Sequence, residues 1–234
     1  MRQNPSFVLG DVADIRRLIA ENPWVTLVAH TANGLTASHY AVVLDPDRDD
    51  LTILGHVGRP DEAILELGQG ELLVIVQGPH GYISPGWYDD KPAVPTWNYV
   101  VAHLSGMPEI LSDEENYRVL GALVEHFEKR MPEPRLMEGT PANAAYAERI
   151  SAGTVGFRLT PTRVTGKRKL SQNRPDETIE TIIFELENGS EYPNPALAAE
   201  MRRVHEVRQE PGERQDPQEP QDHQGSQGLR VPRA

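Results

Sequence analysis

The sequence contains no cysteine among its 234 residues. This absence excludes disulfide bridges, thiolate nucleophiles, zinc–cysteine sites, iron–sulfur clusters and haem held by a thiolate. Any metal in this protein must therefore be held by histidine, tyrosine, methionine, lysine or carboxylate side chains.

Long apolar runs and positive charge are also scarce. No segment, including the N-terminal MRQNPSFVLGDVADIRR, is apolar over the length of a signal peptide or a membrane span, so we expect a soluble cytoplasmic protein. Lysine and arginine number 23 against 35 aspartates and glutamates, which gives a net charge of −12. Because nucleic-acid binding relies on cations that displace phosphate counterions, this acidity argues against direct DNA binding unless a local basic patch provides it.

The chain is long enough for one well-buried domain, or for a barrel with added helices, and short for two large domains. Residues 207–234 are dominated by glutamine, proline, glycine and charge, with no aromatic side chain. Burial in such a segment cannot offset the entropy lost on ordering it. We therefore predict one folded domain over residues 1–206 and a disordered tail over residues 207–234.

Hydrophobic periodicity predicts a barrel with peripheral helices. Asp11 can cap a first helix that runs to about Glu21. Five β-rich runs follow, separated by turns and by the short helical segment PDEAILELG: WVTLVAH, LTASHYAVVLD, LTILGHV, ELLVIVQG and NYVVAHLSG. DEENYRVLGALVEHFEKRM, PANAAYAERI and PDETIETIIFELENG are predicted helices, and TVGFRLTPTRVTG is a predicted late strand. This order favours a barrel over alternating βαβ units.

A basic segment stands out against the acidic background. Its cations, with no acidic residue between them, are Arg163, Lys167, Arg168, Lys169 and Arg174. Ser171, Gln172 and Asn173 add hydrogen-bond donors suited to a phosphate or carboxylate, and a helix beginning near Pro175 would add free backbone N–H groups. The alternative, a solvated basic strand that balances acidic neighbours, stays open.

A proline-rich aromatic stretch, PHGYISPGWYDDKPAVPTWNY, is the second feature. Its aromatic residues are Tyr82, Trp87, Tyr88, Trp97 and Tyr99, and its prolines are Pro79, Pro85, Pro92 and Pro95. A stiff aromatic loop can cover a flat ring system, and it can equally belong to a subunit interface or to the core. Ser84 lacks the G-x-S-x-G spacing of hydrolases, and the chain has no P-loop.

Four histidines lie in or at the ends of predicted strands: His39, His56, His80 and His103. A lone histidine at such a position is usually a hydrogen-bonded core residue. Four of them on adjacent strands can instead line one cavity and supply a haem ligand, a general base or contacts to a flavin. None belongs to HExxH or another short metal motif, and we expect structural or exposed positions for the others: His30, His126, His205 and His223.

Together, VIVQGPHGYISPGWY, VPTWNYVVAHLSG and KLSQNR resemble the PaiB-type family of FMN-binding negative transcriptional regulators, over about Phe7 to Leu186. ASHYAVVLD and GHVGRP are similar to the family's THLP and GH-containing motifs, so the four histidines fall at matching places. The resemblance implies an α+β fold of the FMN-binding split β-barrel type, with peripheral helices, a homodimer and a cofactor pocket near the subunit interface. Two departures are Ala41, where the family has proline, and the run Arg59-Pro60-Asp61-Glu62, which replaces Asn-Pro-Gln-Trp.

The superfamily resemblance also extends to haem-dependent piperazate synthases, which close N5-hydroxyornithine through an N–N bond. We therefore expect a planar anionic cofactor, FMN or haem b. The residues expected around it are His39, His56, His80, Tyr82, Ser84, Trp87, Trp97, His103, Lys167, Lys169, Ser171, Gln172 and Asn173. Catalytic residues and any small-molecule substrate stay open.

Three functional hypotheses follow. In the flavin hypothesis the basic segment holds the FMN phosphate and Trp97 or Tyr82 packs near the isoalloxazine, giving a binding or redox protein. In the haem hypothesis the same segment holds the propionates, and one of the four strand histidines is the axial ligand. In the third hypothesis the protein is a non-enzymatic regulator that binds DNA or a partner protein.

Overall fold

The computed structural model describes residues 1, 4–88 and 92–209, and its strands form one curled sheet. The order of the nine strands is β1-β9-β6-β5-β2-β3-β4-β8-β7, and all neighbours are antiparallel. The strands are β1 (Val8–Leu9), β2 (Trp24–Thr31), β3 (Gly34–Leu44), β4 (Ile53–Gly58), β5 (Leu72–Ile83), β6 (Thr96–Gly106), β7 (Glu109–Ile110), β8 (Thr154–Leu159) and β9 (Arg163–Lys169).

Six α-helices surround this sheet within the described residues. They are α1 (Val12–Glu21), α2 (Arg59–Leu65), α3 (Asp113–Glu128), α4 (Pro141–Ser151), α5 (Asp176–Asn188) and α6 (Pro195–Gln209), with single 3₁₀ turns η1 (Pro5–Phe7) and η2 (Pro85–Trp87). Of these helices, none combines the length and the apolar character needed to cross a membrane. The predicted combination of an antiparallel sheet with peripheral helices is confirmed.

The predicted elements are confirmed in most of the chain, and the exceptions lie toward the C-terminal end. Asp11 caps α1 by accepting a hydrogen bond from the Asp14 amide, as predicted. The single late strand predicted over TVGFRLTPTRVTG is wrong, because β8 and β9 are separate strands that pair with β4 and β6 respectively. Pro161, which has no amide hydrogen for a ladder bond, lies in the break between them.

Helix α6 was not expected from the sequence. Its buried apolar side chains, Leu197, Ala198, Met201 and Val204, form a narrow stripe on an otherwise polar helix. The helix runs to Gln209, so it passes the predicted start of the tail at residue 207. The remainder of the predicted tail, residues 210–234, lies outside the described residues.

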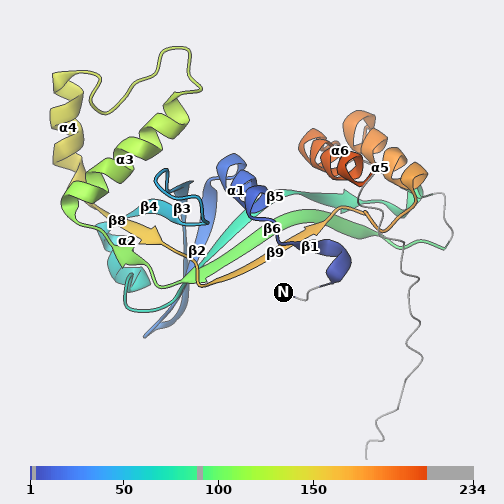
Figure 1. The fold of residues 1–234 in the computed structure, drawn as a ribbon, viewed down its shortest axis with the longest axis horizontal. Coiled ribbons are helices and arrows are strands. Elements are labelled where there is room, and N and C mark those ends of the chain that lie inside the picture. Colours follow the sequence, from blue (N-terminus) through green and yellow to red (C-terminus); the bar gives the residue numbers. More distant parts are fainter. Residues whose placement is uncertain (2–3, 89–91, 210–234) are drawn as a thin grey trace, which may run out of the picture.

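The long strands have one face under helices and one open face. Along β6, Asn98, Val100 and Ala102 are buried, whereas Trp97 and Tyr99 point to the other side. Helices α1, α5 and α6 lie on the same side of β5, β6 and β9, above the buried side chains (Figure 1). We call the other side the open face; it carries Val28, His30, His39, Leu73, Ile75, His80, Tyr82, Trp97, Tyr99, Val101, His103, Arg163, Thr165, Lys167 and Lys169.

A β-bulge in β5 sets which side chains reach the open face. Gln77 pairs with Val101 and His80 pairs with Tyr99, so β5 has one more residue than β6 between these two pairs, at Gly78-Pro79. The extra residue resets the alternation of β5. As a result, Tyr82 shares the open face with its partner Trp97, and Gly81, between His80 and Tyr82, faces the helices.

Glu200 joins the helices on the covered side. Its side chain is 7% exposed, and its carboxylate accepts hydrogen bonds from Arg17 on α1 at 2.9 Å and from Arg203 on α6 at 2.8 Å. Asp14 extends this network, because it pairs with Arg203 at 3.2 Å and with Arg168 on β9 at 2.7 Å. Burial works to raise the pKa of Glu200, but the hydrogen bonds from Arg203 and Arg17 outweigh it, so the pKa lies below its ordinary value.

We predict that Glu200→Gln lowers the free energy of unfolding at pH 7 by about 1–3 kcal/mol, since it removes the buried charge that Arg17 and Arg203 share. A carboxyl group whose pKa is lowered by folding stabilises the native state above its unfolded pKa, and this contribution disappears as the pH falls. The difference between wild type and variant should therefore shrink below about pH 4.5. Urea unfolding of both proteins at pH 7 and below pH 4.5 measures this difference in free energy. Glu206→Gln, an exposed position on the same helix, should change stability by less than about 0.5 kcal/mol.

Candidate functional site

Strands β6 and β9 bring the predicted lysines and one predicted histidine together on the open face. Lys169 lies opposite Tyr99, Lys167 lies opposite Val101, and His103 lies opposite Thr165. Directly opposed residues of an antiparallel pair project from the same side of the sheet. Successive pairs on this side are about 7 Å apart along the strand, so the three pairs form one continuous strip.

The two lysines form a cationic pair beside an aromatic ring. Lys167 Nζ lies 5.7 Å from the centre of the Tyr99 ring, and Lys169 Nζ contacts Thr96 Oγ1. Burial lowers the pKa of Lys169, and the positive charges of Lys167 and Arg174 lower it further. Since Lys169 has no carboxylate partner among the described residues, an anion bound here would relieve the repulsion between these cations.

A groove of about 450 Å³ lies beside this strip, within the size range of cofactor pockets. It is lined by Met1, Val28, Ala29, His30, Leu35, Glu71, Leu73, His103, Ser105, Arg163 and Thr165. Val28 and Leu73 are cross-strand partners and supply apolar surface on the floor of the groove. Arg163 and Glu71 pair at 3.3 Å at its rim. We call it the flavin-sized groove.

Two histidines line this groove. Burial lowers the pKa of His103, and the nearby N-terminal ammonium lowers it further, so the imidazole is neutral at pH 7. His30 is exposed, as expected, and its side chain also lines the flavin-sized groove together with His103. The alternation of WVTLVAH could have predicted this position, because it places His30 on the same side of the strand as Val28.

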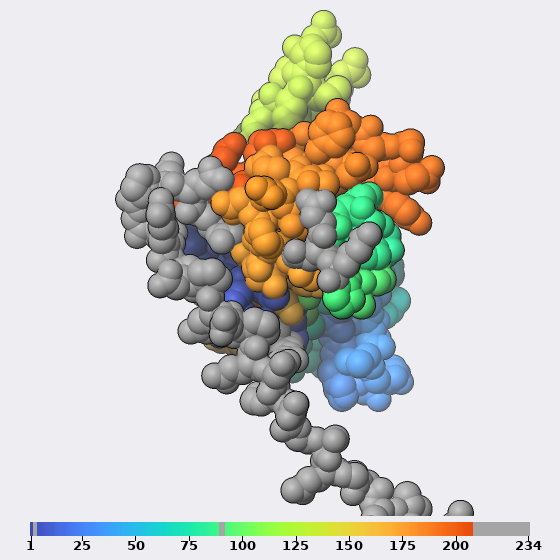
Figure 2. Space-filling view, turned by 90° about the vertical axis from the view of Figure 1, so that its right-hand side faces the viewer, coloured from blue at the N-terminus to red at the C-terminus, as the bar shows by residue number. Residues whose placement is uncertain are grey.

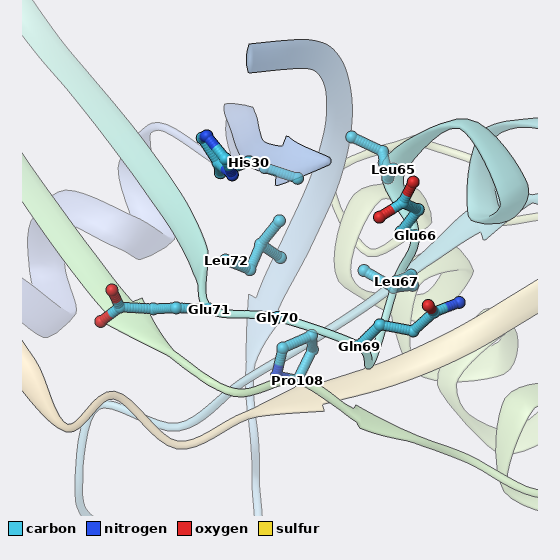
Figure 3. A pocket seen from close by; sticks show the side chains of 10 residues that line it. His30, Leu65, Glu66, Leu67, Gln69, Gly70, Glu71, Leu72 and Pro108 are labelled. Atoms are coloured by element: carbon cyan, nitrogen blue, oxygen red, sulfur yellow. The ribbon is translucent and has the colours of Figure 1, made fainter. Parts of the chain in front are cut away.

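A smaller hollow shares His30 and Glu71 with the flavin-sized groove (Figure 3). It lies where α2 leads into β5 and has a volume of about 40 Å³. Glu66, Gln69 and Pro108 are among its lining residues. This volume accommodates water but not a flavin or a haem.

The other predicted histidines are separated from His103. His39 lies in the same row of the open face, three strands away, which corresponds to about 14 Å. His80 lies past the bulge, stacked against Trp97 with ring centres 6.4 Å apart. The described residues contain no group of three His, Asp or Glu side chains that could hold a metal ion.

His56 is a predicted site residue that does not line the flavin-sized groove. It lies on the same side of β4 as Leu54, which packs under α3, and its ring makes an edge contact with Tyr40 at 6.1 Å. Burial lowers the pKa of His56, and within the described part of the chain its Nδ1 is buried without a hydrogen-bond partner. His56 is thus half-buried beside the cluster that packs under α3, and it is not among the residues that line the flavin-sized groove.

The departure from the family pattern at Asp61 has a structural role. Asp61 lies in the first turn of α2, and its Oδ2 accepts hydrogen bonds from Ser38 at 2.7 Å and from Tyr40 at 2.8 Å. The Tyr40 hydroxyl oxygen accepts a hydrogen bond from the Gly58 amide. The carboxylate therefore fixes α2 against β3.

The predicted donors that follow β9 are largely used within the chain. Ser171 is buried and exchanges hydrogen bonds with the equally buried Asn98, at 2.9 Å and 3.2 Å. Gln172 closes the turn, since its side chain accepts from the Leu170 amide and donates to the Arg168 carbonyl. Asn173 is exposed.

The remaining predicted residues lie near the end of β5. Ser84 caps η2 by accepting a hydrogen bond from the Gly86 amide at 3.1 Å, and Trp87 packs partly buried against the core. Tyr82 and Trp97 lie on the open face with ring centres 6.4 Å apart. Of the predicted residues, those on the open face beside the flavin-sized groove are thus His103, Lys167 and Lys169.

Comparisons with known proteins agree with this architecture. Residues 1–163 match the family described as "Putative FMN-binding domain". "Protease synthase and sporulation protein PAI 2" of Bacillus subtilis (strain 168) is 31% identical over 197 residues, which cover 83% of this chain and 93% of that protein.

Two solved structures share the fold. The FAD and heme binding protein from Mycobacterium smegmatis matches with a TM-score of 0.51 and 19% identity, over 73% of this chain and 76% of that one. The flavocytochrome Anf3 from Azotobacter vinelandii matches with a TM-score of 0.53 and 11% identity, over 72% of each chain. At these identities the likeness shows the fold alone. It supports the predicted antiparallel barrel-type sheet with peripheral helices, which the structure has as a curled half-barrel.

We predict that Ser171→Ala lowers the free energy of unfolding by about 1–3 kcal/mol, because it leaves the buried Asn98 Oδ1 without the Ser171 donor and Nδ2 with only the weak acceptor Met201 Sδ. The exposed neighbour provides a matched control: Asn173→Ala should cost less than about 0.5 kcal/mol. Chemical denaturation of both variants measures the difference. Equal stabilities for the two variants would contradict a structural role for Ser171.

Proposed function

Because this chain belongs to the FMN-binding domain family, we propose that it binds FMN on the open face, with the ring system in the flavin-sized groove and the phosphate on Lys167 and Lys169. The observation that carries the proposal is the cationic pair. Two ammonium groups lie close enough for one to lower the pKa of the other, and they follow Thr165, which lines a groove with apolar surface, along the same side of β9. In a strongly acidic chain, such a pair is suited to an anion.

The described residues fit the chemical requirements of FMN. Val28 and Leu73 offer apolar surface to a flat ring system, and the neutral His103 can donate or accept a hydrogen bond at its polar edge. Lys167 lies about 7 Å along the strand from the His103 pair, so ring and phosphate can be held by the same strip. Thr165 and Ser105 add hydroxyl groups between them and the rim.

A bound FMN supplies transfer of one or two electrons, which gives the protein a redox role. The chain itself would position the flavin and neutralise its phosphate. A regulatory outcome, in which the flavin state controls a partner, is suggested by the relative named for protease synthesis and sporulation. Direct DNA binding has less support, since the net charge is −12.

A second copy of the chain is the proposed cover for the open face. Leu73 and Ile75 on β5 and Val101 on the neighbouring strand β6 are partly exposed there. A homodimer through this face would bury those side chains and enclose the cofactor between subunits. Sedimentation of the purified protein reports whether the dimer forms.

Haem b is the second candidate, and two histidines that line one groove favour it. His103 and His30 both line the flavin-sized groove, and Arg163 and the lysines can pair with propionates. A haem protein of this kind is the basis for proposing a piperazate-synthase activity. We expect a flavin doublet in the absorption spectrum of protein purified with both cofactors supplied. A Soret band would instead favour haem, and cyclisation of N5-hydroxyornithine would then test the enzyme activity.

We predict that Lys169→Ala weakens FMN binding about ten- to a hundredfold, which is the cost of losing one charge-assisted contact to the phosphate. Quenching of flavin fluorescence during titration measures the affinity. Lys129→Ala removes an exposed charge at the end of α3 and should leave the affinity within about twofold. Equal affinities for wild type and Lys169→Ala would place the phosphate elsewhere.

A further inference from the structure

A second groove, distinct from the flavin-sized groove, lies past the β-bulge on the same face. It has a volume of about 420 Å³ and is lined by His80, Gly81, Tyr82, Trp97, Tyr192, Pro193 and Asn194. Tyr82 is at its centre, with ring centres 5.2 Å from Tyr192 and 6.4 Å from Trp97. Trp97 is 55% exposed and Tyr192 is 62% exposed, so two large rings present free surface. We call it the aromatic groove.

The loop that carries Tyr192 is anchored to the sheet. The side-chain Nδ2 of Asn194 donates to the His80 carbonyl at 2.9 Å, and its backbone amide donates to the Leu186 carbonyl at 2.7 Å. Its side-chain Oδ1 accepts from the Leu197 amide at the start of α6. A Cβ at Gly81 would lie 3.0 Å from Asn194 Nδ2, so glycine permits this approach. In the space-filling view, the green chain around β5 lies against the orange chain of the α5 and α6 region (Figure 2).

Tyr192 has a backbone conformation that side-chain-bearing residues rarely adopt. Its φ is +57°, in the left-handed region where glycine would be less strained. The three hydrogen bonds of Asn194 hold the loop in place despite this strain. Strain of this kind, at a large and exposed aromatic residue, is typical of positions maintained for binding.

The cationic pair lies between the two grooves. Trp97 is two residues from Tyr99, the partner of Lys169, and Lys169 Nζ contacts Thr96 next to Trp97. His103 is six residues from Trp97, about 20 Å along the strand, so one ring system cannot occupy both grooves. A ligand in the aromatic groove would therefore place its anionic group on the lysines, and its ring would lie outside the flavin-sized groove.

We propose that the aromatic groove binds the base of an adenylate whose phosphate lies on Lys169. Bases stack on exposed aromatic rings, and the groove has no acidic lining residue that would favour a cationic ligand. This inference rests on the proposed function, because a pyrophosphate bond would join an FMN phosphate on the same lysines to that adenylate. The protein then takes its flavin as the dinucleotide FAD, and the aromatic groove is the site for the adenine.

Titration of the full-length protein with FMN and with FAD tests the inference. We expect FAD to bind about five- to a hundredfold tighter than FMN, the range given by stacking of one base. Trp97→Ala and Tyr192→Ala should reduce FAD affinity toward that of FMN and leave FMN affinity unchanged, whereas Trp97→Phe should retain most of the preference. Phe184→Ala, which removes an exposed aromatic ring on α5, should alter neither affinity.

A parallel titration with ADP separates failure of the inference from failure of the proposed function. Binding of ADP that Trp97→Ala abolishes, together with a preference for FAD, supports the inference. Equal affinities for FAD and FMN in the wild type, or equal losses of both in Trp97→Ala, would overturn it, even if ADP binds as a separate ligand. If neither flavin binds, the proposed function fails, and with it the dinucleotide assignment, whereas ADP binding then reports on the aromatic groove alone.

Discussion

One extra residue in β5, at Gly78-Pro79, determines which side chains of the long β5–β6 hairpin face the helices and which face outward. After this bulge, Tyr82 meets Trp97 on the open face and Gly81 meets the start of α6 on the covered face. Proline suits the bulge because a ladder hydrogen bond is not required there. Both the aromatic groove and the docking of α6 thus depend on the same local irregularity.

The alternation of β9 divides the basic segment between structure and site. Arg168 points to the covered side, where it pairs with Asp14, and Lys167 and Lys169 point to the open face. Glu200 ties α1 to α6 on the covered side, so the helices behind the sheet are fixed before any ligand is bound. The cations that are adjacent in sequence therefore lie on opposite sides of one strand, with Arg168 in an ion pair and the two lysines in the candidate site.

Local patterns predicted most helices and strands, since periodicity and capping act over a few residues. Helix α6 escaped prediction because its apolar stripe is narrow, and the break between β8 and β9 depends on which strands each one joins. Within the candidate site, the lysines and His103 could be predicted from charge and strand position. The burial of Ser171 against Asn98 and the isolation of His56 could not, because they depend on partners distant in sequence.

The cations around Lys169 couple anion binding to uptake of a proton by its amine. Because neighbouring charges and burial favour the neutral amine, a share of the Lys169 population gives up its proton at a lower pH than a free lysine would. A bound phosphate favours the ammonium form, so the protein takes up a proton as the ligand enters at alkaline pH, and affinity must fall there by the same linkage. At the proposed phosphate site, high pH would therefore weaken cofactor binding through the single side chain of Lys169.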